Sequence, residues 1–103
     1  MQDAIVAAAT TLGWRTYHTY DSRRSAPGFP DLCMVREQRL VFAELKSTRG
    51  KITMPQALWL DALKEAGVEC YVWRPAEWES GEIVDLLAAR KRDSQLAMQA
   101  DYQ

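Results

Sequence analysis

Apolar and polar positions follow each other along this chain in blocks that predict a mixed α/β structure. The clearest block pairs two apolar runs, residues 28–36 and 40–46, around a polar break at 37–39. Two apolar runs joined by a short polar segment are typical of a β-hairpin. We therefore predict an antiparallel hairpin over residues 28–46.

The register of this hairpin decides which side chains meet at its open end. If the turn centres near Gln38, Asp31 lies roughly opposite Leu45, since both stand seven residues from that centre. Alternate side chains of a strand share one face, so Glu44 and Lys46 point the same way. The open end of the hairpin therefore gathers two carboxylates and one ammonium group.

Helical spacing and strand alternation define the remaining elements. We predict helices over residues 3–12, 53–66 and 81–92, and strands over 14–20 and 68–74. Thr53 is the expected N-cap of the second helix, and Gln56 stands three residues later in a capping-box arrangement. The apolar stripe predicted for that helix consists of Leu58, Trp59, Ala62, Leu63 and Ala66.

The order of these elements predicts the topology. The helix at 53–66 connects the second hairpin strand to the strand at 68–74, and such a crossover makes the two strands parallel. The expected fold is a small mixed sheet with helices on its faces. We expect one α/β domain over residues 1–92 and a polar C-terminal tail over 93–103, either helical or frayed.

The overall composition and charge of the chain do not indicate a function, so any chemistry must come from a local group of residues. The 103 residues are 48% hydrophobic and 26% charged with a net charge of −1, so nucleic-acid binding would need a local basic patch. No apolar run approaches the ~20 residues of a membrane span, and no secretory signal pattern stands at the start. Cys33 and Cys70 fit reduced core thiols of a cytosolic protein, although a disulfide between them stays open.

Asp31, Glu44 and Lys46 form the strongest candidate site. Buried ionised groups are costly unless they are paired or bind a metal, and two neighbouring carboxylates suit a hard divalent cation such as Mg²⁺. A nearby lysine could neutralise developing negative charge or position a water molecule. The alternative is that Glu44 and Lys46 are solvated residues where a strand leaves the sheet. The full string Gly-Phe-Pro-Asp, a hydrophobic hairpin and Ala-Glu-Leu-Lys favours the site.

Pro30-Asp31 together with Glu44-Leu45-Lys46 resembles the signature of the PD-(D/E)xK nucleases. The surrounding residues resemble the VRR-NUC branch of that superfamily, and the resemblance covers about residues 2–86. Its matching segments are Gly13-Trp14, Tyr17-His18, Asp21-Ser22-Arg23-Arg24, Gly28-Phe29-Pro30-Asp31, Phe42-Ala43-Glu44-Leu45-Lys46, Gln56-Ala57-Leu58-Trp59-Leu60 and Val72-Trp73-Arg74-Pro75.

The resemblance implies a restriction-endonuclease-like fold and a divalent-metal-dependent endonuclease that hydrolyses phosphodiester bonds of DNA. Asp31 and Glu44 would hold Mg²⁺ or Mn²⁺ with help from the Leu45 carbonyl, and Lys46 would orient or activate the attacking water. Small stand-alone relatives are expected to act as homodimers on branched DNA such as four-way junctions. The resemblance also suggests a phage- or prophage-encoded protein in the cytoplasm of a bacterial host, without a membrane partner or an organic cofactor.

Polar loops carry further candidates beside the site. Ser22, Arg23 and Arg24 precede the hairpin, and Arg49 and Lys51 follow it, so together they could contact phosphates from two sides. We favour a phosphate contact by at least one of Arg23 and Arg24, with no preference between Arg49 and Lys51. Ordinary solvated loop charge is the alternative for all five residues.

Gln56 and Gly28 each allow two explanations. The capping box alone explains Gln56, whereas the resemblance implies a glutamine near the active site, and both roles can hold. Gly28 either permits a close backbone approach at the mouth of the site or is a turn glycine. The resemblance favours the site.

The chain departs from the family pattern at the start of the first helix, where relatives usually carry a glutamate close to the metal. This chain has Gln2 and Asp3 there. Either Asp3 substitutes, or the chain begins just after the position of the glutamate, or the ligand is missing. A missing ligand would favour the competing function, a non-catalytic nucleic-acid-binding module that retains the nuclease fold.

Overall fold

A mixed four-stranded sheet forms the centre of the fold, in a computed structural model that describes residues 1–19 and 26–89. The elements in chain order are α1 (Gln2–Thr11), β1 (Arg15–His18), β2 (Leu32–Arg36), β3 (Arg39–Leu45), α2 (Met54–Glu65), β4 (Glu69–Trp73), α3 (Pro75–Glu79) and α4 (Glu82–Ala88). The strand order is β1-β2-β3-β4, with β3 and β4 parallel and the other pairs antiparallel. The predicted α/β class and crossover are confirmed.

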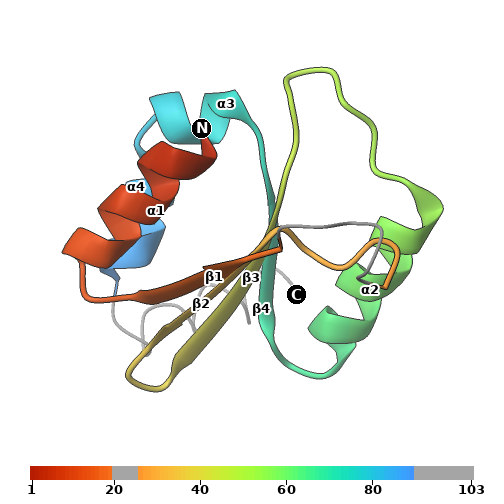
Figure 1. Ribbon diagram of the computed structural model, residues 1–103, viewed down its shortest axis with the longest axis horizontal. Helices are drawn as coiled ribbons and strands as arrows, with labels where there is room; N and C mark the ends of the chain where they lie inside the picture. Colours follow the sequence, from red (N-terminus) through yellow and green to blue (C-terminus); the bar gives the residue numbers. More distant parts are fainter. Residues whose placement is uncertain (20–25, 90–103) are drawn as a thin grey trace, which may run out of the picture.

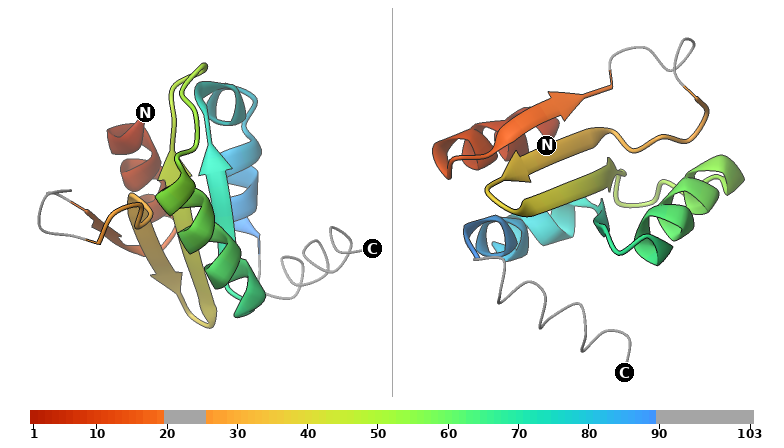
Figure 2. Two further views of the ribbon diagram at one scale, coloured as in Figure 1. Left: turned by 90° about the vertical axis from the view of Figure 1, so that its right-hand side faces the viewer. Right: turned by 90° about the horizontal axis from the view of Figure 1, so that it is seen from below.

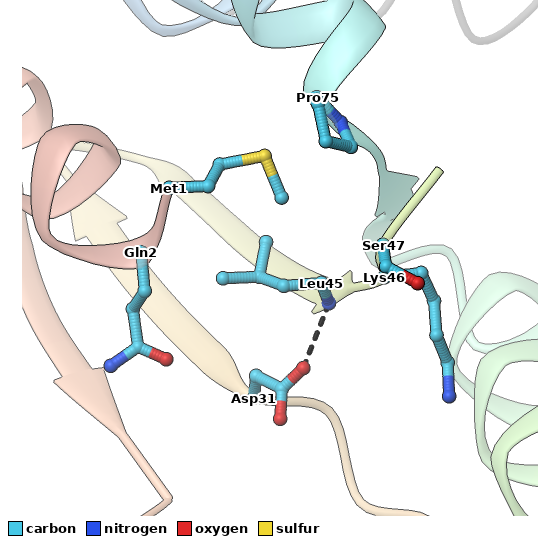
Figure 3. Close-up of a pocket in the computed structure, with 7 residues that line it drawn as sticks. All are labelled: Met1, Gln2, Asp31, Leu45, Lys46, Ser47 and Pro75. Atoms are coloured by element: carbon cyan, nitrogen blue, oxygen red, sulfur yellow. Dashed lines mark hydrogen bonds between the residues drawn. The ribbon is translucent and has the colours of Figure 1, made fainter. Parts of the chain in front are cut away.

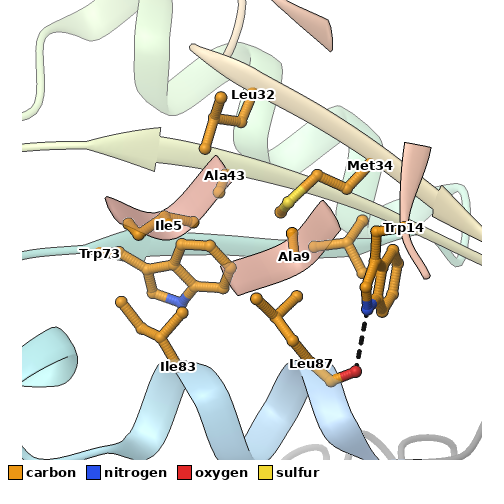
Figure 4. Close-up of a cluster of buried hydrophobic side chains, with 10 residues drawn as sticks. Ile5, Ala9, Trp14, Leu32, Met34, Ala43, Trp73, Ile83 and Leu87 are labelled. Carbon is orange, nitrogen blue, oxygen red and sulfur yellow. Dashed lines mark hydrogen bonds between the residues drawn. The ribbon is translucent and has the colours of Figure 1, made fainter. Parts of the chain in front are cut away.

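The helices lie on both faces of the sheet. Figure 1 shows α1 and α4 on one side and α2 on the other. On the first side, α1 and α4 pack against the sheet through fully buried aliphatic side chains such as Ile5 and Leu87 (Figure 4). The buried cluster consists of Ile5, Ala9, Trp14, Leu32, Met34, Val41, Ala43, Trp73, Ile83 and Leu87.

The second face is covered by α2 over β3 and β4 only (Figure 2). Phe29 joins the helix to the sheet, because its ring stands edge-on to Phe42 at 5.7 Å and to Trp59 at 5.0 Å between centroids. The predicted apolar stripe of α2 is partly wrong. Leu58 is 62% exposed, and Leu60, outside that stripe, is buried. Apolar residues stand on several sides of this helix, so the contact of Trp59 with Phe29 selects the inward face.

The centre of the hairpin turn lies between Glu37 and Gln38, half a residue before the predicted centre at Gln38. Arg36 pairs with Arg39 across a two-residue loop, and Glu37 adopts a left-handed backbone with φ 53°. Two-residue hairpin loops need such positive φ values to match the twist of the strands. The register therefore continues to Asp31 opposite Glu44 rather than opposite Leu45.

The last part of the domain differs from the prediction in two ways. A short helix, α3, begins at Pro75, where the sequence predicted only the end of a strand. Proline suits the first turn of a helix, because the N–H groups of that turn have no helical partner. The last helix ends at Ala88, because Ala89 has an extended backbone. The predicted tail over 93–103 lies outside the described residues.

Arg39 ties the start of β3 to β4 and to the end of α4. The residue is 3% exposed, and its guanidinium binds both carboxylate oxygens of Glu69 at 2.8 and 2.9 Å. It also donates to the carbonyls of Leu86 and Ala89, and it lies 5.0 Å from the centre of the Trp14 ring. These contacts satisfy carbonyls that a helix leaves unpaired at its C-terminus.

Cys33 and Cys70 cannot form a disulfide with each other. Both stand beside Phe42, one on β2 and the other on β4, with β3 between them. Two strand spacings amount to about 9–10 Å, which exceeds the Cα separation that a disulfide spans. No helix within the described part of the chain is long and apolar enough to cross a membrane.

We predict that Arg39→Met lowers the free energy of unfolding by about 3–5 kcal/mol, because it leaves the buried Glu69 carboxylate without its charged partner and with the hydrogen bond from the Tyr71 hydroxyl. Urea denaturation measures the change. The matched control is Arg15→Met on β1, an exposed position where the same substitution should cost no more than about 0.5 kcal/mol. Equal losses in the two variants would contradict a special role of the Arg39–Glu69 pair.

Candidate functional site

The structure brings Asp31, Glu44 and Lys46 together at one end of the sheet. Asp31 stands directly before β2, Glu44 is the last but one residue of β3, and Lys46 follows that strand. The Asp31 Oδ2 atom accepts a hydrogen bond of 2.8 Å from the backbone N–H of Leu45 (Figure 3). This bond fixes the first carboxylate against the strand that carries the second.

The Glu44 carboxyl is withdrawn from solvent. The residue is 2% exposed, and its Oε2 atom has no hydrogen-bond partner among the residues that the structure describes. The pKa of Glu44 is raised to about 8, first by burial and then by the hydrogen bond and negative charge of Asp31. The charge of Lys46 and the backbone of Leu45 lower it only in part. Without a cation, Glu44 is therefore mostly protonated at neutral pH.

A buried carboxylate oxygen without a partner, beside a second carboxylate, suits a hard divalent cation. The cation would satisfy the oxygen and remove the repulsion between two negative groups. Mg²⁺ is commonly held by one or two carboxylates and keeps several waters. Over residues 1–19 and 26–89, no group of three His, Cys, Asp or Glu side chains could hold a metal ion. The donors thus fit Mg²⁺ or Mn²⁺ held partly by water, and do not fit a closed structural zinc site.

A hollow of about 400 Å³ adjoins Asp31 where α1 and α3 begin and β3 ends (Figure 3). Gln2 lines this hollow, whereas Asp3 is exposed and does not line it. The position of Asp3 therefore does not support the possibility that Asp3 replaces the glutamate of the family. The lining residues are Met1, Gln2, Asp31, Leu45, Lys46, Ser47 and Pro75.

The Gly28 backbone lies very close to the backbone at the start of α2. Its φ is +85°, and an added Cβ atom would lie 2.3 Å from the carbonyl carbon of Pro55 and 2.6 Å from the backbone nitrogen of Gln56. No side chain fits there without moving the backbone. The segment that leads to Asp31 is therefore packed against the first turn of α2, which supports the close-approach explanation of this glycine over the simple turn.

Gln56 has the capping role that the sequence predicted. Its Oε1 atom accepts a hydrogen bond of 2.9 Å from the Thr53 backbone N–H, and its own N–H donates to Thr53 Oγ1 at 3.3 Å. The capping bond uses the amide oxygen and leaves the amide NH₂ available. A role in the site would use this NH₂ group or the second lone pair of the amide oxygen.

Three of the predicted phosphate contacts, Ser22, Arg23 and Arg24, lie outside the described residues. Arg49 and Lys51 are exposed on the loop between β3 and α2. These two cations stand on the same loop that leaves the site after Lys46.

Sequence reasoning missed several residues of the hollow, above all Gln2, Ser47 and Pro75. A signal for two of them was available. The carboxyl ends of parallel strands lie at one edge of a sheet, so residues that follow β3 and β4 must come close together. Ser47 and Pro75 occupy such positions. For Gln2, the sequence offered only the departure from the family's glutamate.

We predict that metal-free protein loses stability as the pH rises from about 4.5 to about 8. In this range the unfolded chain releases the Glu44 proton, while the folded state keeps it because its pKa is about 8. Thermal unfolding in EDTA at pH 5 and pH 8 measures the loss. Glu44→Gln should flatten the dependence, and an unchanged slope in this variant would show that Glu44 is not its source.

Comparison with known proteins gives the family and the fold. The family model of the VRR-NUC domain matches residues 2–77. Among solved structures, a Holliday junction resolvase, Hjc from Archaeoglobus fulgidus, is 18% identical with a TM-score of 0.53, over 71% of this chain and 62% of the resolvase. A VRR_NUC domain protein is 16% identical with a TM-score of 0.51, over 72% of this chain and 77% of that protein.

The chain thus spans less than two thirds of the resolvase, and at this identity the two structures show a shared fold. No curated protein matched the chain. The family match covers most of the domain, including Asp31, Glu44 and Lys46. The chain belongs to the VRR-NUC domain family.

Proposed function

We propose that this protein is a divalent-metal-dependent endonuclease that hydrolyses phosphodiester bonds of DNA. One observation carries the proposal: the buried Glu44 carboxyl has an oxygen without a partner in the described structure, and Asp31 and Lys46 lie beside it. A purely structural site would gain nothing from a buried, unsatisfied carboxyl group. Such a group supports a role in binding a cation.

Each residue of the site has a distinct role in this proposal. Asp31 and Glu44 would hold Mg²⁺ or Mn²⁺, with the Leu45 carbonyl as a further oxygen ligand. When bound, the ion would supply Lewis-acid polarisation of the phosphate and a more acidic water. Asp31 is oriented for this role by the Leu45 N–H. The Lys46 ammonium would orient the water and stabilise the negative charge that develops on phosphorus oxygens.

The proposed substrate is branched DNA. The shared fold with a Holliday junction resolvase supports this choice. Because the net charge of the chain is −1, contacts with phosphates must come from local cations, and Arg49 and Lys51 are exposed beside the site. Phosphate contacts of this kind position a nucleic acid without reading its sequence.

We further propose that the protein acts as a homodimer. One domain presents one pair of carboxylates, at Asp31 and Glu44, and thus one cutting site. Symmetric cleavage of two strands requires two such sites related by a two-fold axis. A dimer of this chain would supply them.

A second candidate function is a nucleic-acid-binding module without catalysis. The position of Gln2 favours it, because an amide lines the hollow where the family usually carries a carboxylate. Fewer negative ligands weaken the binding of a divalent cation. The retention of Asp31, Glu44 and Lys46 at one sheet end favours the nuclease.

Lys46→Ala should lower kcat for cleavage about 10²–10³-fold, the usual cost of removing one donor that stabilises transition-state charge. Labelled four-way junction, flap, single-stranded and linear duplex DNA would be incubated with Mg²⁺, Mn²⁺ or EDTA. Lys64→Ala, an exposed lysine near the end of α2, should cleave like the wild type.

The same assay separates the two candidate functions. Metal-dependent cleavage that is lost in Lys46→Ala would support the nuclease and rank its substrates. If the wild type binds DNA but cleaves none of the four substrates with either metal, the binding module would replace the nuclease.

A further inference from the structure

A tight turn follows Lys46 directly, at residues 47–50. The backbone N–H of Gly50 donates to the Ser47 carbonyl at 3.3 Å and closes the turn. Before it, the Lys46 N–H donates to the Trp73 carbonyl at 2.9 Å and continues the pairing of β3 with β4. Figure 1 shows the connection from β3 to α2 extending past the end of the sheet, in yellow-green. Nothing in the proposed mechanism explains what holds this projecting turn in place.

Arg74 holds the turn from the neighbouring strand end. Its Nη1 atom donates to the Ser47 carbonyl at 2.7 Å and to the Gly50 carbonyl at 2.6 Å. Hydrogen bonds from a charged guanidinium are stronger than neutral ones. One nitrogen atom therefore fixes the first and the last residue of the same turn.

The backbone of Arg74 is itself fixed, so the guanidinium reaches out from a rigid base. Its N–H donates to Glu77 Oε2 at 3.1 Å, and Pro75 begins α3 immediately after it. Proline restricts φ of its own residue and the conformation of the residue before it. Arg74 thus connects the junction of β4 and α3 to the turn that follows β3.

The turn lies next to the side chain of Lys46. A Cβ atom added to Gly50 would lie 2.9 Å from Ser47 Oγ and 3.5 Å from Lys46 Cδ. The side of Gly50 that carries no Cβ atom therefore faces the Lys46 side chain and the Ser47 hydroxyl, and a larger residue at this position would crowd both. Ser47 also lines the hollow beside Asp31. Movement of Gly50 would change the space beside the Lys46 side chain.

We propose that Arg74 is a positioning residue of the site, which locks the 47–50 turn and thereby holds Lys46 in place. This inference rests on the proposed nuclease function for its effect on catalysis. The Arg74–Ser47 bond is exposed and the Arg74–Gly50 bond is partly buried, so water can reach both carbonyls when the guanidinium is removed, at modest cost to the fold. Loss of Arg74 should therefore disturb the turn locally and leave the stability of the domain nearly unchanged.

The test compares Arg74→Met and Arg74→Lys with the wild type in two measurements. Amide hydrogen exchange by NMR follows the Gly50 N–H, which donates within the turn. Cleavage kinetics with Mg²⁺ separate kcat from KM. For Arg74→Met we expect Gly50 exchange to rise about tenfold, with exchange in β3 unchanged. We also expect kcat to fall about tenfold, because Lys46 acts in the transition state, whatever change in KM follows from displacement of Arg49 in the same turn.

Arg74→Lys serves as the conservative variant, since one ammonium group can still donate to a turn carbonyl. It should restore part of the Gly50 protection and part of kcat. Arg15→Met removes the same charge from an exposed site on β1 and should leave both readings at wild-type values. Thermal unfolding checks that each variant is folded.

Wild-type exchange at Gly50 in Arg74→Met would overturn the inference, as would raised exchange with an unchanged kcat. The exchange measurement needs no nuclease activity. If the wild type itself fails to cleave DNA, the proposed function is overturned, and Gly50 exchange still decides whether Arg74 locks the turn.

Discussion

Burial of the Glu44 carboxyl beside Asp31 is the constraint on which the site depends. Only 2% of Glu44 is exposed, and one of its oxygens has no partner within the described structure. Proteins seldom keep such a group unless a ligand uses it. The raised pKa of Glu44 indicates that its carboxyl group keeps a proton at neutral pH when no cation is bound. In the proposed metal site, binding of the cation would therefore release this proton.

The two ends of β3 differ: one end stabilises the fold and the other carries the candidate site. Arg39 begins the strand and binds Glu69 of β4 and the end of α4. Glu44 stands near the other end of β3, from which the chain continues into the turn that Arg74 holds. Because the buried ion pair and the main core secure the sheet, the opposite end can tolerate an unsatisfied carboxyl group.

Much of the fold was predictable because its signals are local. The hairpin and the α2 capping box follow from alternation and from turn and cap chemistry. The errors have both local and tertiary causes. The two-residue loop at Glu37 moved the register, Phe29 chose the inward face of α2, and Pro75 started a helix. For the site, motif spacing brought Asp31 near Glu44, but Gln2 and Ser47 enter only through the packing of separate elements.

Counting the protons released when Mn²⁺ binds tests the central claim most directly. Titration calorimetry at pH 7, in two buffers of different ionisation enthalpy, gives this number. With a Glu44 pKa of about 8, the wild type should release close to one proton per bound ion. Binding without proton release, or equal release by Glu44→Gln, would show that the buried carboxyl of Glu44 is not the cation ligand.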